Sequence, residues 1–141
     1  MELSQAIGFA HGRSQGVLIT IRRDSRPQVS NIVYLMEPDG STRISVTEGR
    51  AKTKNLRRDQ RAQLYVSADT FWQYAVFDGT AQLSPPAAEP GDEVVDELVD
   101  MYRRIRGEDH PDWDEYRWAM VSERRVVLSF HPSSAYGLLR D

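Results

Sequence analysis

The chain contains no cysteine in its 141 residues. This absence excludes disulfide bonds, thiolate nucleophiles, thiolate zinc sites and a cysteine-linked flavin. No stretch approaches the roughly 18 consecutive apolar residues of a membrane-spanning helix. The first ten residues also lack the basic segment of a secretory signal. We therefore expect a cytoplasmic protein with no membrane partner.

The chain also has little excess of charge of one sign, because 21 acidic and 18 basic residues leave a formal net charge of −3. A chain with this balance, whose aromatic residues do not alternate with its bases, does not predict a surface that follows a nucleic-acid backbone. Apolar residues make up 40% and charged residues 28%, which is typical of a globular protein. The length predicts a single domain over residues 1–141. From the charge balance and the placement of the aromatic residues we expect no nucleic-acid partner.

The three histidines are too few and too scattered for a metal centre. His11, His110 and His131 lie far apart in the sequence and show no ligand spacing such as His-x-x-x-His. We expect no metal site. No side chain stands out as a general acid either, so the catalytic residues stay unassigned.

What the chain does have is a series of strand signals. Six runs rich in apolar, β-branched and aromatic residues are interrupted by turn residues, and the runs cover 16–22, 27–35, 42–47, 62–68, 72–83 and 124–130. Helical spacing or caps predict helices at the N-terminus and, late in the chain, over 92–106 and 112–121. Short strands interrupted late by a helical pair predict a mainly β, α+β fold, in which peripheral helices pack outside a small antiparallel barrel.

One cluster of bases carries most of the functional information. Residues 50–61 hold six of the eighteen lysines and arginines and a single acidic residue. The cluster follows the predicted strand over 42–47, so we expect it to open a helix. Helix N-termini present unpaired N–H groups and a positive dipole end. Arg50, Lys52 and the Thr53 hydroxyl are therefore predicted to form a cradle for a phosphate or carboxylate.

Two readings of these bases and of nearby polar residues stay open. The bases can form a solvated helix face, although uncompensated like charges repel by a few tenths of a kcal/mol per pair, which favours an anionic partner. Gln28 and Ser30 share one face of their strand and Asn31 lies on the other. Either all three face solvent, or Gln28 and Ser30 line a groove beside the barrel and hydrogen-bond a ring system. Trp72 and Tyr74 share a strand face, as core or interface residues or as an aromatic wall.

Several separated motifs occur in a defined order along the chain. They are residues 26–31, 50–59, 72–76 and 79–83, followed by a helix over 112–117 and a strand from 124. Together they resemble the pyridoxamine-5′-phosphate-oxidase-like, coenzyme F420-dependent oxidoreductases, over roughly residues 13–139. The resemblance implies a six-stranded antiparallel split β-barrel of the FMN-binding type. It also implies a homodimer with two cofactor sites at the subunit interface.

The resemblance further implies a role for each candidate residue. Those expected to hold the cofactor phosphate are Arg50, Lys52 and Thr53. Those expected beside the deazaflavin ring are Gln28, Ser30 and Asn31, and Ser45 and Asn55 are further cofactor contacts. Trp72 and Tyr74 would come from the opposite subunit to wall the pocket. The candidates for the polyglutamate tail of the cofactor are Lys54, Arg57, Arg124 and Arg125.

We therefore expect an F420-dependent reductase that transfers a hydride between the deazaflavin ring and a small organic substrate, which the sequence does not name. An FMN-dependent oxidoreductase on the same barrel stays open, because a phosphate clamp does not distinguish the two cofactors. A non-catalytic flavin- or deazaflavin-binding protein also stays open. Residues 129–138 lack the Arg-x-His pair of true pyridoxamine phosphate oxidases, which argues against oxidation of vitamin B6.

Overall fold

The fold was established from a computed structural model that describes residues 1–140. The strands are β1 (Gln15–Ile21), β2 (Pro27–Val33), β3 (Leu35–Met36), β4 (Thr42–Thr47), β5 (Arg61–Ser67), β6 (Tyr74–Leu83) and β7 (Arg125–Leu138). The helices are α1 (Leu3–Ala10), α2 (Ala51–Arg58), α3 (Glu93–Arg106) and α4 (Trp113–Ser122). No helix among these residues is both long and apolar enough to cross a membrane.

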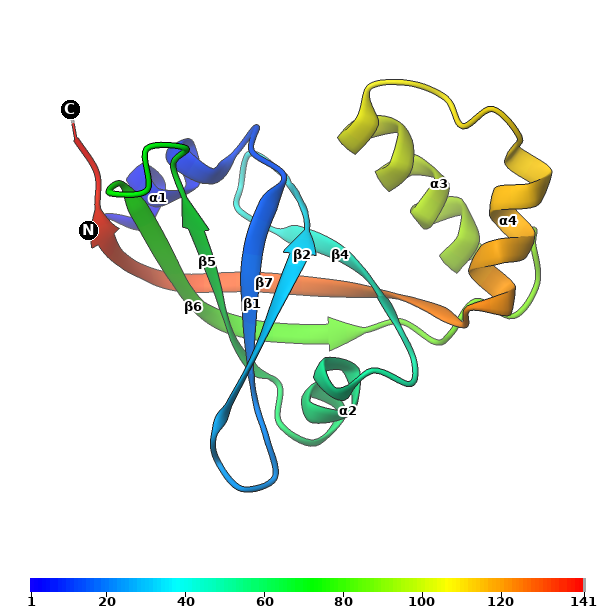
Figure 1. Ribbon diagram of the computed structural model, residues 1–141, viewed down its shortest axis with the longest axis horizontal. Coiled ribbons are helices and arrows are strands. Elements are labelled where there is room, and N and C mark those ends of the chain that lie inside the picture. The colour runs from blue at the N-terminus through cyan, green and yellow to red at the C-terminus, as the bar shows by residue number, and fades with distance from the viewer. Residues whose placement is uncertain (141) are drawn as a thin grey trace.

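All the strands belong to one antiparallel sheet, in the order β2-β1-β5-β6-β7-β4-β3. The sheet curls into an incomplete barrel, and the helices lie around its outside (Figure 1). In the described residues β2 pairs only with β1, and β4 pairs with β7 and β3. The barrel is therefore split between β2 and β4. This arrangement confirms the predicted α+β split-barrel fold.

The six predicted strands are all present, but three of them differ in extent, and the short β3 adds a seventh. The run predicted over 72–83 begins only at Tyr74, so the prediction that Trp72 shares a strand face with Tyr74 is wrong. The run over 27–35 is interrupted at Tyr34, whose N–H donates to the Ser14 carbonyl and whose buried hydroxyl donates to the Ala10 carbonyl. The last strand does not end at residue 130. It continues to Leu138, because its second half pairs with β6 from Tyr74 onwards.

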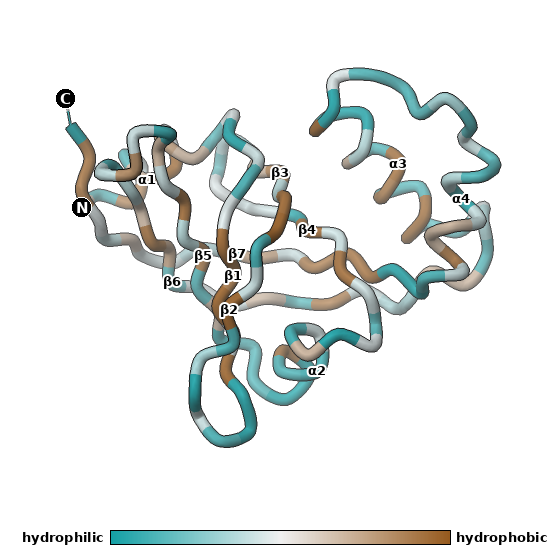
Figure 2. Tube along the Cα trace, viewed as in Figure 1, coloured by the Kyte–Doolittle hydropathy of each residue, from teal (hydrophilic) through white to brown (hydrophobic). Residues whose placement is uncertain are grey.

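The barrel core follows from the two-residue period of the strands. Alternate residues of β4 and β5 are buried, and the largest enclosed side chains include Phe77, Phe130 and Leu64. Figure 2 shows apolar positions recurring along the strands, whereas α2 is mainly hydrophilic. Burial of these apolar side chains drives the sheet to curl around its core. Because α2 is mainly hydrophilic, this helix is held in place by other contacts.

The two late helices form a smaller apolar cluster beside the barrel. Buried Val95, Leu98 and Met101 of α3 pack with Met120 of α4 and Val127 of β7. The predicted caps are confirmed. The Asp92 carboxylate accepts from the Val95 N–H, and Gly107 ends α3 in the left-handed conformation at φ 71°. The α3–α4 pair thus stands next to the open side of the barrel.

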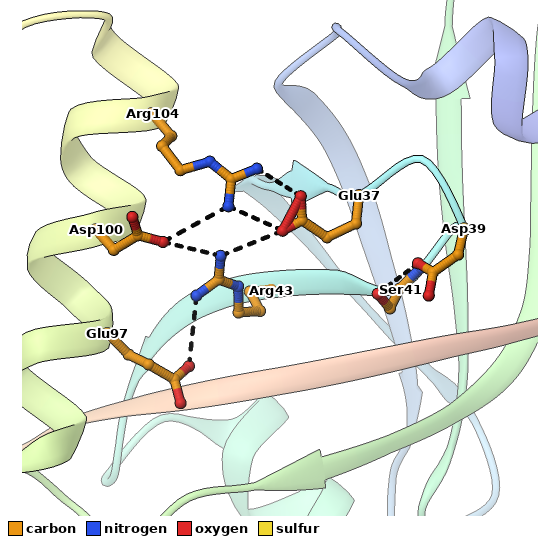
Figure 3. Close-up of polar contacts among 7 residues, drawn as sticks. All are labelled: Glu37, Asp39, Ser41, Arg43, Glu97, Asp100 and Arg104. Atoms are coloured by element: carbon orange, nitrogen blue, oxygen red, sulfur yellow. Dashed lines mark hydrogen bonds and ion pairs between the residues drawn. The ribbon is translucent and has the colours of Figure 1, made fainter.

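A network of ion pairs ties α3 to the sheet (Figure 3). Arg43 of β4 lies 3.1 Å from Asp100, 3.5 Å from Glu37 and 3.6 Å from Glu97. Arg104 pairs with Glu37 as well, and its hydrogen bond lowers the pKa of that carboxyl. Isolated exposed pairs contribute little, but a connected network has more effect. This network fixes how α3 faces β4.

An added methyl group at Gly79 should be harmful to the sheet. This glycine lies at a register shift between β6 and β7, and a Cβ there would overlap the backbone carbonyl oxygen of His131. We expect Gly79→Ala to lower the free energy of unfolding by about 2 kcal/mol. Gly91→Ala is the matched control, because no atom lies within 4 Å of its added Cβ. Chemical denaturation measures both, and equal stability would contradict the packing described.

Candidate functional site

The split in the barrel opens into a cleft. The cleft has a volume of about 660 Å³ and lies between β2 and β4, with the first turn of α2 at one side and α3 and α4 opposite. Figure 1 shows α2 beneath the split, directly after β4. Five predicted cofactor residues line this cleft together, namely Asn31, Ser45, Arg50, Lys52 and Arg125.

The position of α2 depends on two buried polar side chains. The Thr53 hydroxyl donates to the Thr47 carbonyl of β4 at 2.7 Å, and the Asn55 amide donates to the Thr20 hydroxyl of β1 at 3.1 Å. Thr53 is 0% exposed and does not line the cleft. Its hydroxyl proton is therefore used within the protein, which differs from the predicted role as a phosphate ligand. Asn55 likewise holds the helix in place.

The first turn of α2 is an open donor site. No side chain caps it, and it contains no acidic residue. The first N–H groups of a helix have no intrahelical partner, and the helix dipole adds positive potential there. Arg50, at the N-cap, and Lys52 line the cleft at this end. The geometry provides main-chain and side-chain donors for one anion.

Bases line this side of the cleft without an acidic residue among them. Of the described residues that line the cleft, none carries a carboxylate. Burial lowers the pKa of Lys52, and the nearby charges of Arg50 and Arg125 lower it further. Arg125 forms an ion pair with Glu123, which lies outside the cleft, at 2.8 Å. The Arg125 guanidinium also lies 3.5 Å from the Ser45 hydroxyl. An anion bound here would relieve this repulsion. We call Arg50, Lys52 and Arg125 the cation clamp.

The opposite wall of the cleft is apolar and aromatic. It is formed by Met101, Tyr102 and Ile105 of α3 and Tyr116 of α4. The Tyr116 hydroxyl donates to the Leu98 carbonyl at 3.1 Å, and burial raises its pKa to about 12, so it stays a neutral donor. The sequence showed that apolar residues recur at helical spacing in α3, but not which part of the molecule they face. The cleft suits a ligand with an apolar planar body and an anionic group.

The other predicted residues near α2 lie on its far side. Gln28, Lys54, Asn55 and Arg57 border a groove of about 530 Å³, which also includes Arg22, Arg23 and Arg58. Arg57 there forms an ion pair with Glu48. Ser30 lies on the same face of β2 as Gln28 and borders neither the groove nor the cleft.

Three further candidates lie away from the cleft within one chain. Trp72 is 67% exposed, and Tyr74 stacks on Tyr65 with ring centroids 5.7 Å apart. Arg124 has φ 51° and connects α4 to β7, because its N–H donates to the Val121 carbonyl. Of the two adjacent arginines, Arg125 therefore faces the cleft and Arg124 does not.

Comparisons with known proteins agree with this architecture. A family model described as pyridoxamine 5′-phosphate oxidase matches residues 6–138. The fold is similar to a conserved hypothetical protein of Mycobacterium tuberculosis, with a TM-score of 0.72 and 20% identity over 97% of this chain and 84% of that one.

Two further solved structures share the fold. One is described as an F420 reductase, with a TM-score of 0.63 and 21% identity over 87% of this chain and 89% of that one. The other is a heme storage protein of Vibrio cholerae, with a TM-score of 0.66 and 16% identity over 97% of this chain and 95% of that one. At these identities the likeness shows the fold alone.

The lowered pKa of Lys52 should make anion binding depend on pH. Because a bound anion favours the protonated amine, affinity should fall as the pH rises through the lowered pKa, which lies below the ordinary value of 10.5. We expect sulfate, whose charge is constant, to bind more weakly at about pH 10 than at about pH 7. Lys52→Arg should remove this dependence, since arginine stays charged. Sulfate-dependent shifts in melting temperature measure it, and identical pH profiles would contradict the assignment.

Proposed function

Because the chain belongs to the pyridoxamine 5′-phosphate oxidase family, we propose that it binds coenzyme F420 in the cleft and acts as an F420-dependent oxidoreductase on a small organic substrate. The observation that carries the proposal is that the cation clamp and an apolar and aromatic wall line the same cleft, whose described lining contains no carboxylate. That one protein of the same fold is described as an F420 reductase adds support.

The clamp fits the phosphate of the cofactor. Arg50 and Arg125 offer paired guanidinium donors, Lys52 offers a compact positive charge, and the first turn of α2 adds main-chain N–H groups. Thr53 contributes through its backbone position in that turn, since its hydroxyl is engaged with Thr47.

The rest of the cleft fits a planar ring. Met101, Tyr102 and Ile105 face the ring from across the cleft and keep water away from it, while Asn31 and Ser45 offer polar groups from the strands. When bound, the deazaflavin supplies the hydride chemistry, and the protein supplies orientation and electrostatics. The half-buried Tyr116 side chain donates its hydroxyl hydrogen bond to the Leu98 carbonyl, so it stiffens the wall.

A second copy of the chain is part of the proposal. Large apolar residues are exposed, including Val29 at 60% and Val33 at 47% on β2, and Trp72 at 67% just before β6. Val29 and Val33 share a face of β2 with Asn31, which borders the cleft. Apolar surface of this kind is typical of an interface. A homodimer covering it would bring Trp72 and Tyr74 of the partner toward the cofactor, as the family resemblance implies.

The groove beyond α2 favours F420 over FMN. Its basic residues Arg22, Arg23, Lys54 and Arg58 extend the positive surface past the phosphate position. F420 carries an acidic polyglutamate tail that such a groove can hold, and FMN ends at its phosphate. FMN remains the alternative cofactor on the same barrel, because a phosphate clamp alone does not distinguish the two cofactors.

Removing the charge of Lys52 tests the proposal. We expect Lys52→Ala to weaken F420 binding by about 1.5–3 kcal/mol, the scale of a charge-assisted hydrogen bond, without unfolding the protein. Arg61→Ala is the matched control, because that exposed base lies outside the cleft and pairs with Asp59. Fluorescence titration gives both affinities.

Three results would count against the proposal. Unchanged affinity in a folded Lys52→Ala variant would place the phosphate elsewhere. Tighter binding of FMN than of F420 would favour the FMN-dependent alternative. Absence of turnover with reduced F420 across enones, quinones and nitro compounds would favour a non-catalytic binding protein.

A further inference from the structure

The cleft has a second cationic end that the cofactor clamp does not use. Arg106, the last residue of α3, lines the cleft beside Ser14 and Gln15 at the start of β1. Its guanidinium carbon lies 5.0 Å from the centroid of the Tyr102 ring, which also lines the cleft. Across residues 1–140, Arg106 forms no ion pair with a carboxylate.

The position of Arg106 is not explained by the helix end alone. Cations in the last turn of a helix interact favourably with its dipole. Arg103 and Arg104 already supply that charge in the same turn, and each has an acidic partner, Asp109 and Glu37 respectively. Arg106 differs from both because it borders the cleft and has no acidic partner there. An unpaired guanidinium at a cleft is a ready anion ligand.

The two cationic ends are separated by the apolar wall. The Leu98 carbonyl accepts from Tyr116, which lies near Arg125 of the clamp. Arg106 is eight residues further along α3, which corresponds to about 12 Å of helix. Figure 1 shows α3 running from the α4 side toward the start of β1. Met101, Tyr102 and Ile105 lie between the ends.

We infer that Arg106 and Tyr102 form a second anion subsite, which takes the carboxylate of an aromatic or conjugated acid whose body lies along the apolar wall. The Tyr102 ring holds the guanidinium by its face, so the donor edge is left for the carboxylate. That this acid is the substrate rests on the proposed function. The subsite itself does not depend on the cofactor.

A matched pair of probes tests the subsite directly. We expect the protein to bind 2-naphthoate about tenfold more tightly than 2-naphthamide, which has the same shape without the charge, as one charge-assisted contact implies. Arg106→Gln should remove this preference. Arg103→Gln should keep it, since Arg103 lies in the same turn outside the cleft. Isothermal titration calorimetry on the full chain gives the affinities.

Three other outcomes would overturn the inference. Equal affinity of the two probes for the unmodified protein overturns the inference. A preference that survives Arg106→Gln but disappears in Lys52→Ala also overturns it, because the carboxylate would then occupy the clamp. Loss of F420 affinity in Arg106→Gln as large as in Lys52→Ala would make Arg106 a cofactor ligand and overturns it too. A naphthoate preference that depends on Arg106, in a protein that fails to bind F420, supports the subsite and refutes the proposed function instead.

Discussion

Two buried hydrogen bonds hold α2 in the split of the barrel, and the whole site depends on them. Thr53 bonds to the Thr47 carbonyl of β4 and Asn55 bonds to Thr20 of β1, so the helix bridges strands on both sides of the split. A helix of eight residues with Leu56 as its one large buried apolar side chain would be marginal alone. These bonds fix the direction of its first turn and hence the place of Lys52.

The charges of the molecule divide into two kinds. Between α3 and β4, Arg43 and Arg104 are matched by Glu37, Glu97 and Asp100, and this network holds the helix against the sheet (Figure 3). The described residues that line the cleft include several bases and no acid, and Lys52 is partly desolvated as well. Like charges held together cost free energy unless an anion joins them. The paired network therefore positions α3, and the bases that line the cleft define which ligand it suits.

Local sequence signals predicted much of the fold and part of the site. Asp92 and Gly107 acted through caps that need only their immediate neighbours. The extension of β7 was missed because Pro132 and Gly137 are typical strand breakers, whereas pairing with β6 overrides that preference. Which of Arg124 and Arg125 faces the cleft depends on the turn between α4 and β7, where Arg124 adopts φ 51°.

The site residues show the same limit. Thr53 was correctly placed in the first turn of a helix, but only the tertiary structure shows that its hydroxyl bonds to Thr47. The apolar period of α3 predicted a buried face without saying that Tyr102 would border the cleft. Contacts between segments far apart in the chain decided both. Arg106 was invisible as a candidate for that reason.

A crystal structure of the protein with bound F420 would show where the cofactor phosphate lies. We expect the phosphate within hydrogen-bond distance of the Lys52 amine and of the main-chain N–H groups in the first turn of α2. A phosphate found in the groove on the far side of α2, against Lys54 and Arg58, would contradict this expectation.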